Sequence, residues 1–304
     1  MSRKNRINSL QRNLLNLSAV LAIFIVITAC VCRDNNKSVS NPSETITNQS
    51  IKSETSDPKT SQSSTSKNKQ PDKGDFLVEH IPVQNARYIE VDSQVKQEKL
   101  LERAADNLNR NLSLPYNITL RTKDCGDVNA YYDPRDRSIT ICYELMEHFY
   151  KLFKSTGLSD QQAYDKMFDA IRFAFLHELG HAVIDAYKLP VIGNEEDAAD
   201  RCSSYICLTE LGDEGVRATM AAADAFAIES KIRTPNSRHM ADEHLLQEQR
   251  FYNTLCMIYG SDTNKYNFIV KENYLPKERA VRCPNEFDRT VQSWSSLFEP
   301  WRKD

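Results

Sequence analysis

The chain has 304 residues, a formal net charge of -3, 27% charged residues and 40% hydrophobic residues. This near-balanced charge gives no reason to expect a nucleic-acid partner. A single apolar run approaches membrane length, which excludes a multi-span transporter. The 8 glycines argue against Gly-rich phosphate loops and repeat architectures.

The N-terminus is typical of an export signal. Basic residues without acidic ones precede an apolar run from Leu14 to Ala29, which is short for a transmembrane helix. The run ends Ile27-Thr28-Ala29-Cys30, which resembles the bacterial lipobox. We therefore predict a lipoprotein signal peptide over 1–29 and lipidation of Cys30, which would anchor the chain to a membrane of the cell envelope on its extracytoplasmic side. An uncleaved anchor and secretion after cleavage at Ala29 are the alternatives.

The next segment, 30–75, is expected to be a disordered tether. From residue 33 it is rich in Ser, Thr, Asn, Gln and Lys and contains no aromatic residue. Such a segment cannot bury enough apolar surface to offset the entropy of ordering. The rest of the chain, 76–304, is long enough for one sizeable core and is predicted to be a single catalytic domain.

The periodicity of the domain predicts an α+β fold with a small antiparallel sheet followed by helices. The turn signal Asp133-Pro134 separates two strand candidates and predicts a hairpin. The expected strands are 116–122, 128–132 and 138–143, and the expected helices are 93–112, 144–153, 160–187, 195–211, 214–231 and 239–259.

Six cysteines fall in this domain, and an even number in an exported chain favours disulfides, although fifteen pairings exist. Cys125 and Cys142 bracket the expected hairpin, which favours their pairing. Cys256 and Cys283 form a plausible second pair. The two remaining cysteines lie five apart on one expected helix and are predicted to be buried free thiols: Cys202 and Cys207.

An HExxH motif, from His177 to His181, lies in a strongly apolar helical stretch. Spacing of four residues puts both imidazoles on one helix face, where they can bind one Zn²⁺. Glu178 follows the first histidine and can act as general base toward a water molecule. The alternative is a surface helix that happens to carry two histidines, but so apolar a helix would require buried partners for both.

A third ligand is expected on the following helix. Asn194 can cap that helix, and Glu196 and Asp200 form an ExxxD pair on one face. One of these carboxylates could bind zinc while the other orients a ligating histidine. Glu195 and Asp197 are the competing ligands, and a solvated acidic helix start is the non-functional alternative.

HExxH followed by ExxxD resembles the gluzincin metallopeptidases, with a short gap similar to that of the compact members. The resemblance implies a compact, minigluzincin-like zincin fold in which His177, His181 and Glu196 bind zinc, Glu178 is the base and Asp200 supports a ligand. In such proteins the substrate lies antiparallel to an edge strand, for which 128–132 is the candidate.

Farther along, His244 precedes Arg250 by six residues, as in those compact relatives, whose histidine supports the oxyanion. The resemblance implies catalytic roles for both, and the alternative is a capping histidine and a surface arginine. Segments from Cys125 to Asn253 together resemble a bacterial family labelled only "putative metallopeptidase". That label implies fold and metal, and names no substrate.

The sequence thus predicts a membrane-tethered zinc metallopeptidase with a peptide or protein substrate. The alternative is a non-catalytic zinc- or peptide-binding envelope lipoprotein, although retention of Glu178 argues against it. A third possibility is a deformylase-like hydrolase with Cys142 as metal ligand, but that family's cysteine motif is absent. Oligomeric state is not predicted.

Overall fold

A computed structural model describes residues 69–232 and 236–303. The expected signal peptide, Cys30 and the tether as far as residue 68 lie outside the described residues, so these remain predictions, as do the domain boundaries. Within the described ranges, no helix is both long and apolar enough to cross a membrane.

The sheet has four strands in the order β1-β2-β4-β3 and is mixed. β1 pairs parallel to β2 and β2 parallel to β4, while β3 and β4 form the expected antiparallel hairpin. The strands are β1 (Phe76–His80), β2 (Ile118–Lys123), β3 (Ala130–Asp133) and β4 (Ser138–Cys142).

The expectation of an antiparallel sheet was therefore wrong for two of the three strand pairs. Every residue of β4 is buried, so this strand takes an interior position and the half-exposed β3 is left at the edge. β3, which follows β2 in the sequence, therefore does not pair with β2. β1 was not foreseen because Phe76 is its one buried residue and gives no alternation to detect.

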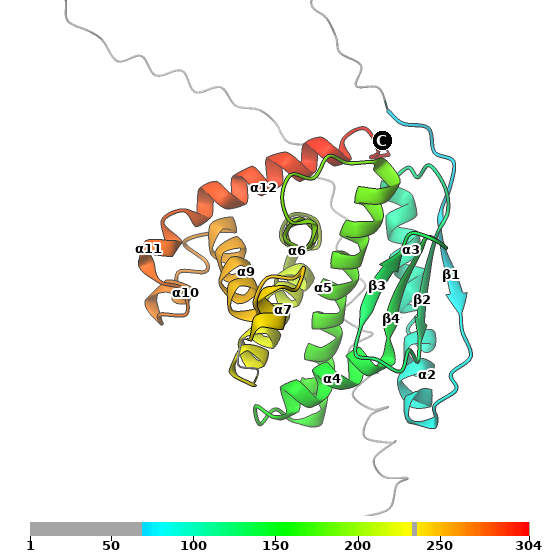
Figure 1. The fold of residues 1–304 in the computed structure, drawn as a ribbon, viewed down its shortest axis with the longest axis horizontal. Coiled ribbons are helices and arrows are strands. Elements are labelled where there is room, and N and C mark those ends of the chain that lie inside the picture. The colour runs from blue at the N-terminus through cyan, green and yellow to red at the C-terminus, as the bar shows by residue number, and fades with distance from the viewer. Residues whose placement is uncertain (1–68, 233–235, 304) are drawn as a thin grey trace, which may run out of the picture. The chain divides into compact units, whose positions relative to one another are not determined.

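Different helices contact the two halves of the sheet (Figure 1). α3 contacts β1 and β2, whereas the long central helix α5 contacts β3 and β4. The expected helix 93–112 is in fact two helices, because Lys99 adopts a left-handed conformation with φ of 51°. The bounds in this half are η1 (Ala86–Tyr88), α2 (Ile89–Gln97), α3 (Leu100–Asn111), α4 (Tyr143–Lys154) and α5 (Asp160–Tyr187).

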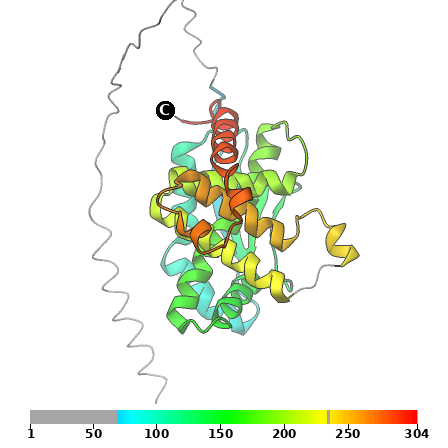
Figure 2. The ribbon, with the colours of Figure 1, turned by 90° about the vertical axis from the view of Figure 1, so that its left-hand side faces the viewer.

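The second half of the domain is helical. α7 packs against α5, α6 and α9, and α12 runs beside α6 and α9 (Figures 1 and 2). The bounds are α6 (Glu195–Glu210), α7 (Gly212–Ile232), α8 (Ser237–Met240), α9 (Gln247–Ser261), α10 (Phe268–Lys271), α11 (Lys277–Ala280) and α12 (Cys283–Phe298).

The expected helix 239–259 is interrupted. α8 ends at Met240 and α9 begins at Gln247. Between them the Asp242 side chain accepts a hydrogen bond from the backbone N–H of His244, at 2.9 Å, an Asx-type turn that competes with helix. The resulting loop, 241–246, lies at the site described below.

Two disulfides join the expected pairs, Cys125–Cys142 and Cys256–Cys283. The first ties the segment after β2 to the start of α4, and the second ties α9 to α12. Cys202 and Cys207 are buried free thiols, as expected.

Candidate metal centre

α5 carries both histidines of the HExxH motif. The helix starts with a complete capping box between Ser159 and Gln162, and most of its residues around the motif are buried. His177 and His181 stand one turn apart on one face, with their Nε2 atoms 3.2 Å apart. His177 is almost fully buried, so its ring needs polar partners.

α6 brings a carboxylate to these rings. Asn194 caps the helix by accepting the N–H groups of Glu196 and Asp197, which fixes the first turn beside α5. Glu196 Oε2 lies 3.0 Å from His177 Nε2, and Glu196 Oε1 lies 3.4 Å from His181 Nε2. The three side chains form a group whose donor atoms all lie within 4.8 Å of one another.

A glycine allows the two helices to approach so closely. A Cβ atom on Gly180 would lie 3.0 Å from the Cα atom of Ala199 and 3.2 Å from its Cβ atom. The small residues at 180 and 199 therefore set the separation between the histidines of α5 and the carboxylate of α6.

The neighbouring acids have other partners. Glu195 Oε1 lies 2.8 Å from His181 Nδ1, and Asp197 accepts a hydrogen bond from Arg201 at 2.8 Å. Neither joins the three-residue group, although both were competing ligands by sequence. The role of Glu195 as the partner of His181 was missed, because sequence alone does not show which carboxylate of a first turn points at which ring nitrogen.

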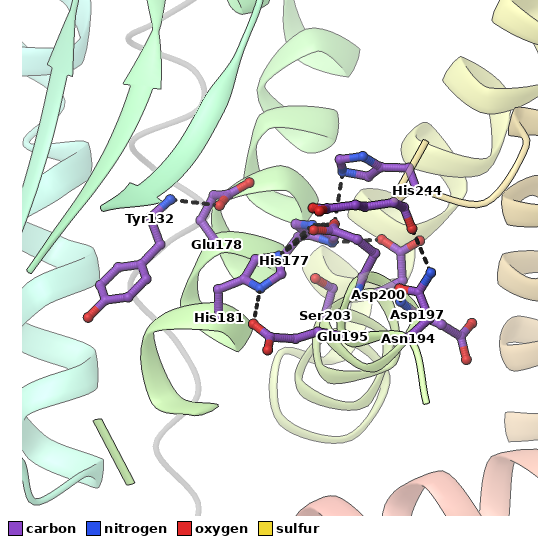
Figure 3. A network of polar contacts seen from close by, with 12 residues as sticks. Tyr132, His177, Glu178, His181, Asn194, Glu195, Asp197, Asp200, Ser203 and His244 are labelled. Carbon is purple, nitrogen blue, oxygen red and sulfur yellow. Dashed lines mark hydrogen bonds and ion pairs between the residues drawn. The ribbon is translucent and has the colours of Figure 1, made fainter. Parts of the chain in front are cut away.

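Each histidine is thus held by a carboxylate on its Nδ1 atom (Figure 3). Asp200 Oδ1 lies 2.8 Å from His177 Nδ1, matching the distance between Glu195 and His181. An acceptor on Nδ1 fixes the proton there and leaves Nε2 free as a ligand atom.

Arg250, on α9, binds Asp200 through two hydrogen bonds of 2.8 Å, from Nε and Nη2. Its side chain is 14% exposed, and its guanidinium lies over the ring of Phe226, 4.1 Å from the centroid. Burial alone would raise the pKa of Asp200, but Arg250 and His177 outweigh it and hold that pKa well below its ordinary value. Arg250 is therefore not a surface residue. It holds Asp200, and Asp200 in turn holds the imidazole of His177.

His244, on the 241–246 loop, lies at the rim of the site. Its Nε2 atom is 2.8 Å from Glu196 Oε2, and its side chain is 48% exposed. The loop is held by Asn194, whose Nδ2 donates to the carbonyl oxygen of Glu243 at 2.6 Å. The residue that caps α6 thus also positions the loop of His244, a link that nothing in the sequence indicates.

Glu178 lies on the other side of the rings, facing the sheet (Figure 3). Its Oε2 accepts the backbone N–H of Tyr132 on edge strand β3, at 2.9 Å. The carboxylate is buried, and burial raises its pKa, although His177, His181 and the Tyr132 N–H act in the opposite direction. A carboxylate with a raised pKa is better able to hold a proton during a reaction.

The donor set fits a catalytic zinc ion. Two imidazoles and one glutamate are a known three-ligand set for catalytic zinc. Ligand atoms about 2.0–2.1 Å from a common tetrahedral ion stand roughly 3.3 Å apart, close to the 3.0, 3.2 and 3.4 Å found among these side chains. The three side chains are therefore spaced like the ligands of one such ion, with either oxygen of Glu196 facing an imidazole.

A cleft of about 620 Å³ opens beside His177 and Glu178. It lies between the segment that leads into β3, the helices α4, α5 and α7, and the loop that carries His244. A substrate in this cleft would reach Glu178 and the imidazole of His177 from one side.

The comparisons with known proteins point to one family. A family model described as "Putative metallopeptidase" matches residues 80–298, which include every residue of the site. No curated protein and no solved structure matches the chain.

Proposed function

We propose that this chain, which belongs to the family described as "Putative metallopeptidase", is a zinc-dependent peptidase that hydrolyses peptide bonds in the cleft beside α5. The observation that carries the proposal is the placement of the His177, His181 and Glu196 donor atoms next to a buried glutamate. Zinc binding alone would not require that second carboxylate.

We assign zinc to His177, His181 and Glu196. When bound there, zinc acts as a Lewis acid toward water and toward the peptide carbonyl oxygen. Asp200 and Glu195 keep the two Nδ1 protons in place, so that both Nε2 atoms stay available. Arg250 keeps Asp200 ionised and is a positioning residue.

Glu178 is the general base. Because Glu178 Oε2 accepts a hydrogen bond from the Tyr132 N–H, Glu178 Oε1 is the atom that accepts the proton of the attacking water. The same carboxylate then delivers the proton to the departing amine. His244 faces the cleft from the opposite rim, where a donated N–H would stabilise negative charge on the carbonyl oxygen.

The free edge of β3 suits the substrate backbone. Among the residues that the structure describes, β3 pairs only with β4, and Tyr132 turns its N–H toward Glu178, away from β4. By the alternation of a strand, Ala130 presents its backbone groups to the same free edge, and Ala130 also lines the cleft. A peptide added antiparallel to β3 would therefore lie along the cleft.

We further propose that the domain is tethered to an envelope membrane by a lipid on Cys30. The support is the lipobox-like segment from Ile27 to Cys30 and the polar tether behind it. The two disulfides agree with an extracytoplasmic location.

The test of the proposed activity separates the base from the ligands. Glu178→Gln should bind zinc in a near-stoichiometric amount while kcat on a peptide library falls by about 10²–10⁴-fold. Glu196→Gln should lose zinc, and Glu195→Gln is the matched control, expected to weaken zinc binding by only about 10–100-fold. Zinc content is measured by mass spectrometry.

Two outcomes would contradict the proposal. If Glu196→Gln retained zinc while Glu195→Gln released it, the third ligand would be wrong. If the zinc-loaded wild type cleaved no peptide, the chain would be a zinc- or peptide-binding protein on the same scaffold.

A further inference from the structure

The cleft has walls of a particular chemistry. α4, α5 and α7 contribute aromatic side chains at Phe149, Phe173 and Phe226, and the rings of Phe173 and Phe226 meet edge to face at 6.3 Å. The lining also includes four small residues on α5 and α7: Ala170, Ala174, Ala222 and Ala225. Such a surface accommodates an extended side chain with an apolar stem.

One carboxylate, that of Glu229, lines the cleft together with these apolar residues. Glu229 on α7 is 13% exposed and lines the cleft. Its Oε1 lies 2.7 Å from Nε2 of His148 on α4, and within the described part of the chain nothing hydrogen-bonds its Oε2. The Oε2 atom of Glu229 therefore remains available as a hydrogen-bond acceptor for a bound group.

Glu229 and His177 line the same cleft. Phe173 lies one helical turn before His177, and its ring meets that of Phe226 edge to face. Glu229 follows Phe226 by three residues, about 5 Å along α7. A substrate side chain that packs on this aromatic wall therefore lies in the same cleft as Glu229.

Acidic side chains outnumber lysine and arginine side chains along the cleft. Of the described residues that line it, five are acidic: Asp127, Glu178, Glu229, Asp242 and Glu248. Arg250 is the one lysine or arginine among those lining residues, and its guanidinium is bound to Asp200. The cleft therefore lacks a free strong cation of its own.

We propose that Glu229 makes this cleft selective for peptides that carry a lysine or arginine side chain beside the scissile bond. The inference rests on the proposed peptidase function. The methylene stem of that side chain packs against the aromatic walls, and its charged group donates a hydrogen bond to Glu229 Oε2. A purely apolar side chain would instead bury Glu229 without a new partner, which is unfavourable, and an acidic one would be repelled.

The test measures binding rather than cleavage. The zinc-loaded full-length chain carrying Glu178→Gln is titrated by fluorescence anisotropy with uncharged peptides in which a single lysine is moved along the sequence. Each peptide is paired with a twin that has norleucine, which lacks the ammonium group, in place of lysine. Measurements at pH 8 lie above the ordinary pKa of histidine.

We expect at least one lysine peptide to bind about tenfold or more tightly than its twin, as a charge-assisted hydrogen bond would give. Adding Glu229→Gln should reduce that ratio to below about twofold, because the amide has no charge to offer. Asp213→Asn removes the same charge from an exposed position on the same helix and should leave the ratio unchanged. Glu229→Asp keeps the charge and should retain part of the preference.

If the Glu178→Gln protein with Glu229 intact binds lysine peptides no better than their norleucine twins, the inference is overturned. A preference that survives the addition of Glu229→Gln also overturns it. The first comparison stands even if the Glu229→Gln protein fails to fold. Selective binding together with no cleavage by the Glu178-containing protein would support this inference and overturn the proposed peptidase function. Cleavage without selectivity would do the reverse.

Discussion

At the scale of single residues, His177 has a carboxylate on each ring nitrogen. Asp200 lies at Nδ1 and Glu196 at Nε2. Burial would lower the pKa of the ring, but these two carboxylates outweigh it and raise the pKa to about 9. Without metal, a proton on Nε2 occupies the position that a cation would take, so proton and metal compete for the same atom.

The competition predicts a pH dependence of stability in metal-free protein. Because the folded pKa of His177 is raised, its protonation stabilises the fold below the ordinary value of 6.5, and the gain is lost as the pH rises through about 9. The free energy of unfolding, measured with urea in the presence of a chelator, should therefore fall between these two pH values. The decrease should shrink in His177→Asn and in zinc-loaded wild type. A metal-free protein whose stability rises across this range would contradict the prediction.

Arg250 should matter for stability and for metal affinity. Arg250→Met leaves Asp200 buried without its main cation, which should cost about 3–5 kcal/mol of unfolding free energy and weaken zinc binding by about 10–100-fold. Urea denaturation and zinc titration measure the two effects. Arg217→Met removes a 57% exposed arginine from α7 and is the control, with an expected change within about 0.5 kcal/mol.

The pair can be tested as a unit. Asp200→Asn combined with Arg250→Met should be less destabilising than the sum of the single changes, because the double variant leaves no isolated charge. Additive effects, or an Arg250→Met protein with wild-type stability and zinc affinity, would show that the ion pair does not support the site.

At the scale of elements, the site depends on how closely α5 and α6 pack. The histidines come from one helix and Glu196 from the other, and the contact between Gly180 and Ala199 sets the gap. The first disulfide acts on a different element: Cys125–Cys142 ties the segment before β3 to α4, and that segment contributes Val128 and Asn129 to the cleft.

Gly180→Ala should therefore reduce zinc affinity by displacing α6. The added methyl would lie 3.0 Å from backbone and must push the helices apart, an overpacking that costs about 1–3 kcal/mol and is offset in part by the better helix propensity of alanine. Zinc titration is the measurement. Adding Ala199→Gly removes one of the three close carbons and should restore part of the affinity. Unchanged zinc affinity in Gly180→Ala would refute this account of the helix spacing.

At the scale of the whole molecule, a signal peptide and a tether are predicted to precede a domain that contains two disulfides. Cys30→Ala should abolish labelling by a fatty-acid probe and release the protein from membranes, since no other lipid attachment is expected. Zinc binding by the domain should be unchanged, which makes it the control. Lipid labelling that persists in Cys30→Ala would exclude the proposed anchor.

The sequence by itself determined the features that depend on neighbours along one helix. The i, i+4 spacing of His177 and His181, the start of α6 at Asn194 and the hairpin turn all follow from local backbone geometry. Both disulfides could also be anticipated, because their cysteines flank predicted elements.

Tertiary structure alone decided what depends on contacts between elements distant in the chain. Strand order was set by the burial of β4, and the choice of Glu196 over Glu195 was set by which carboxylate the packing of α6 on α5 turns toward the Nε2 atoms. The cleft and its Glu229 appear only when α4, α5 and α7 meet, because side chains from three helices form one surface without any shared sequence pattern. Local propensities therefore define the helix of the HExxH motif, and packing energy defines what surrounds it.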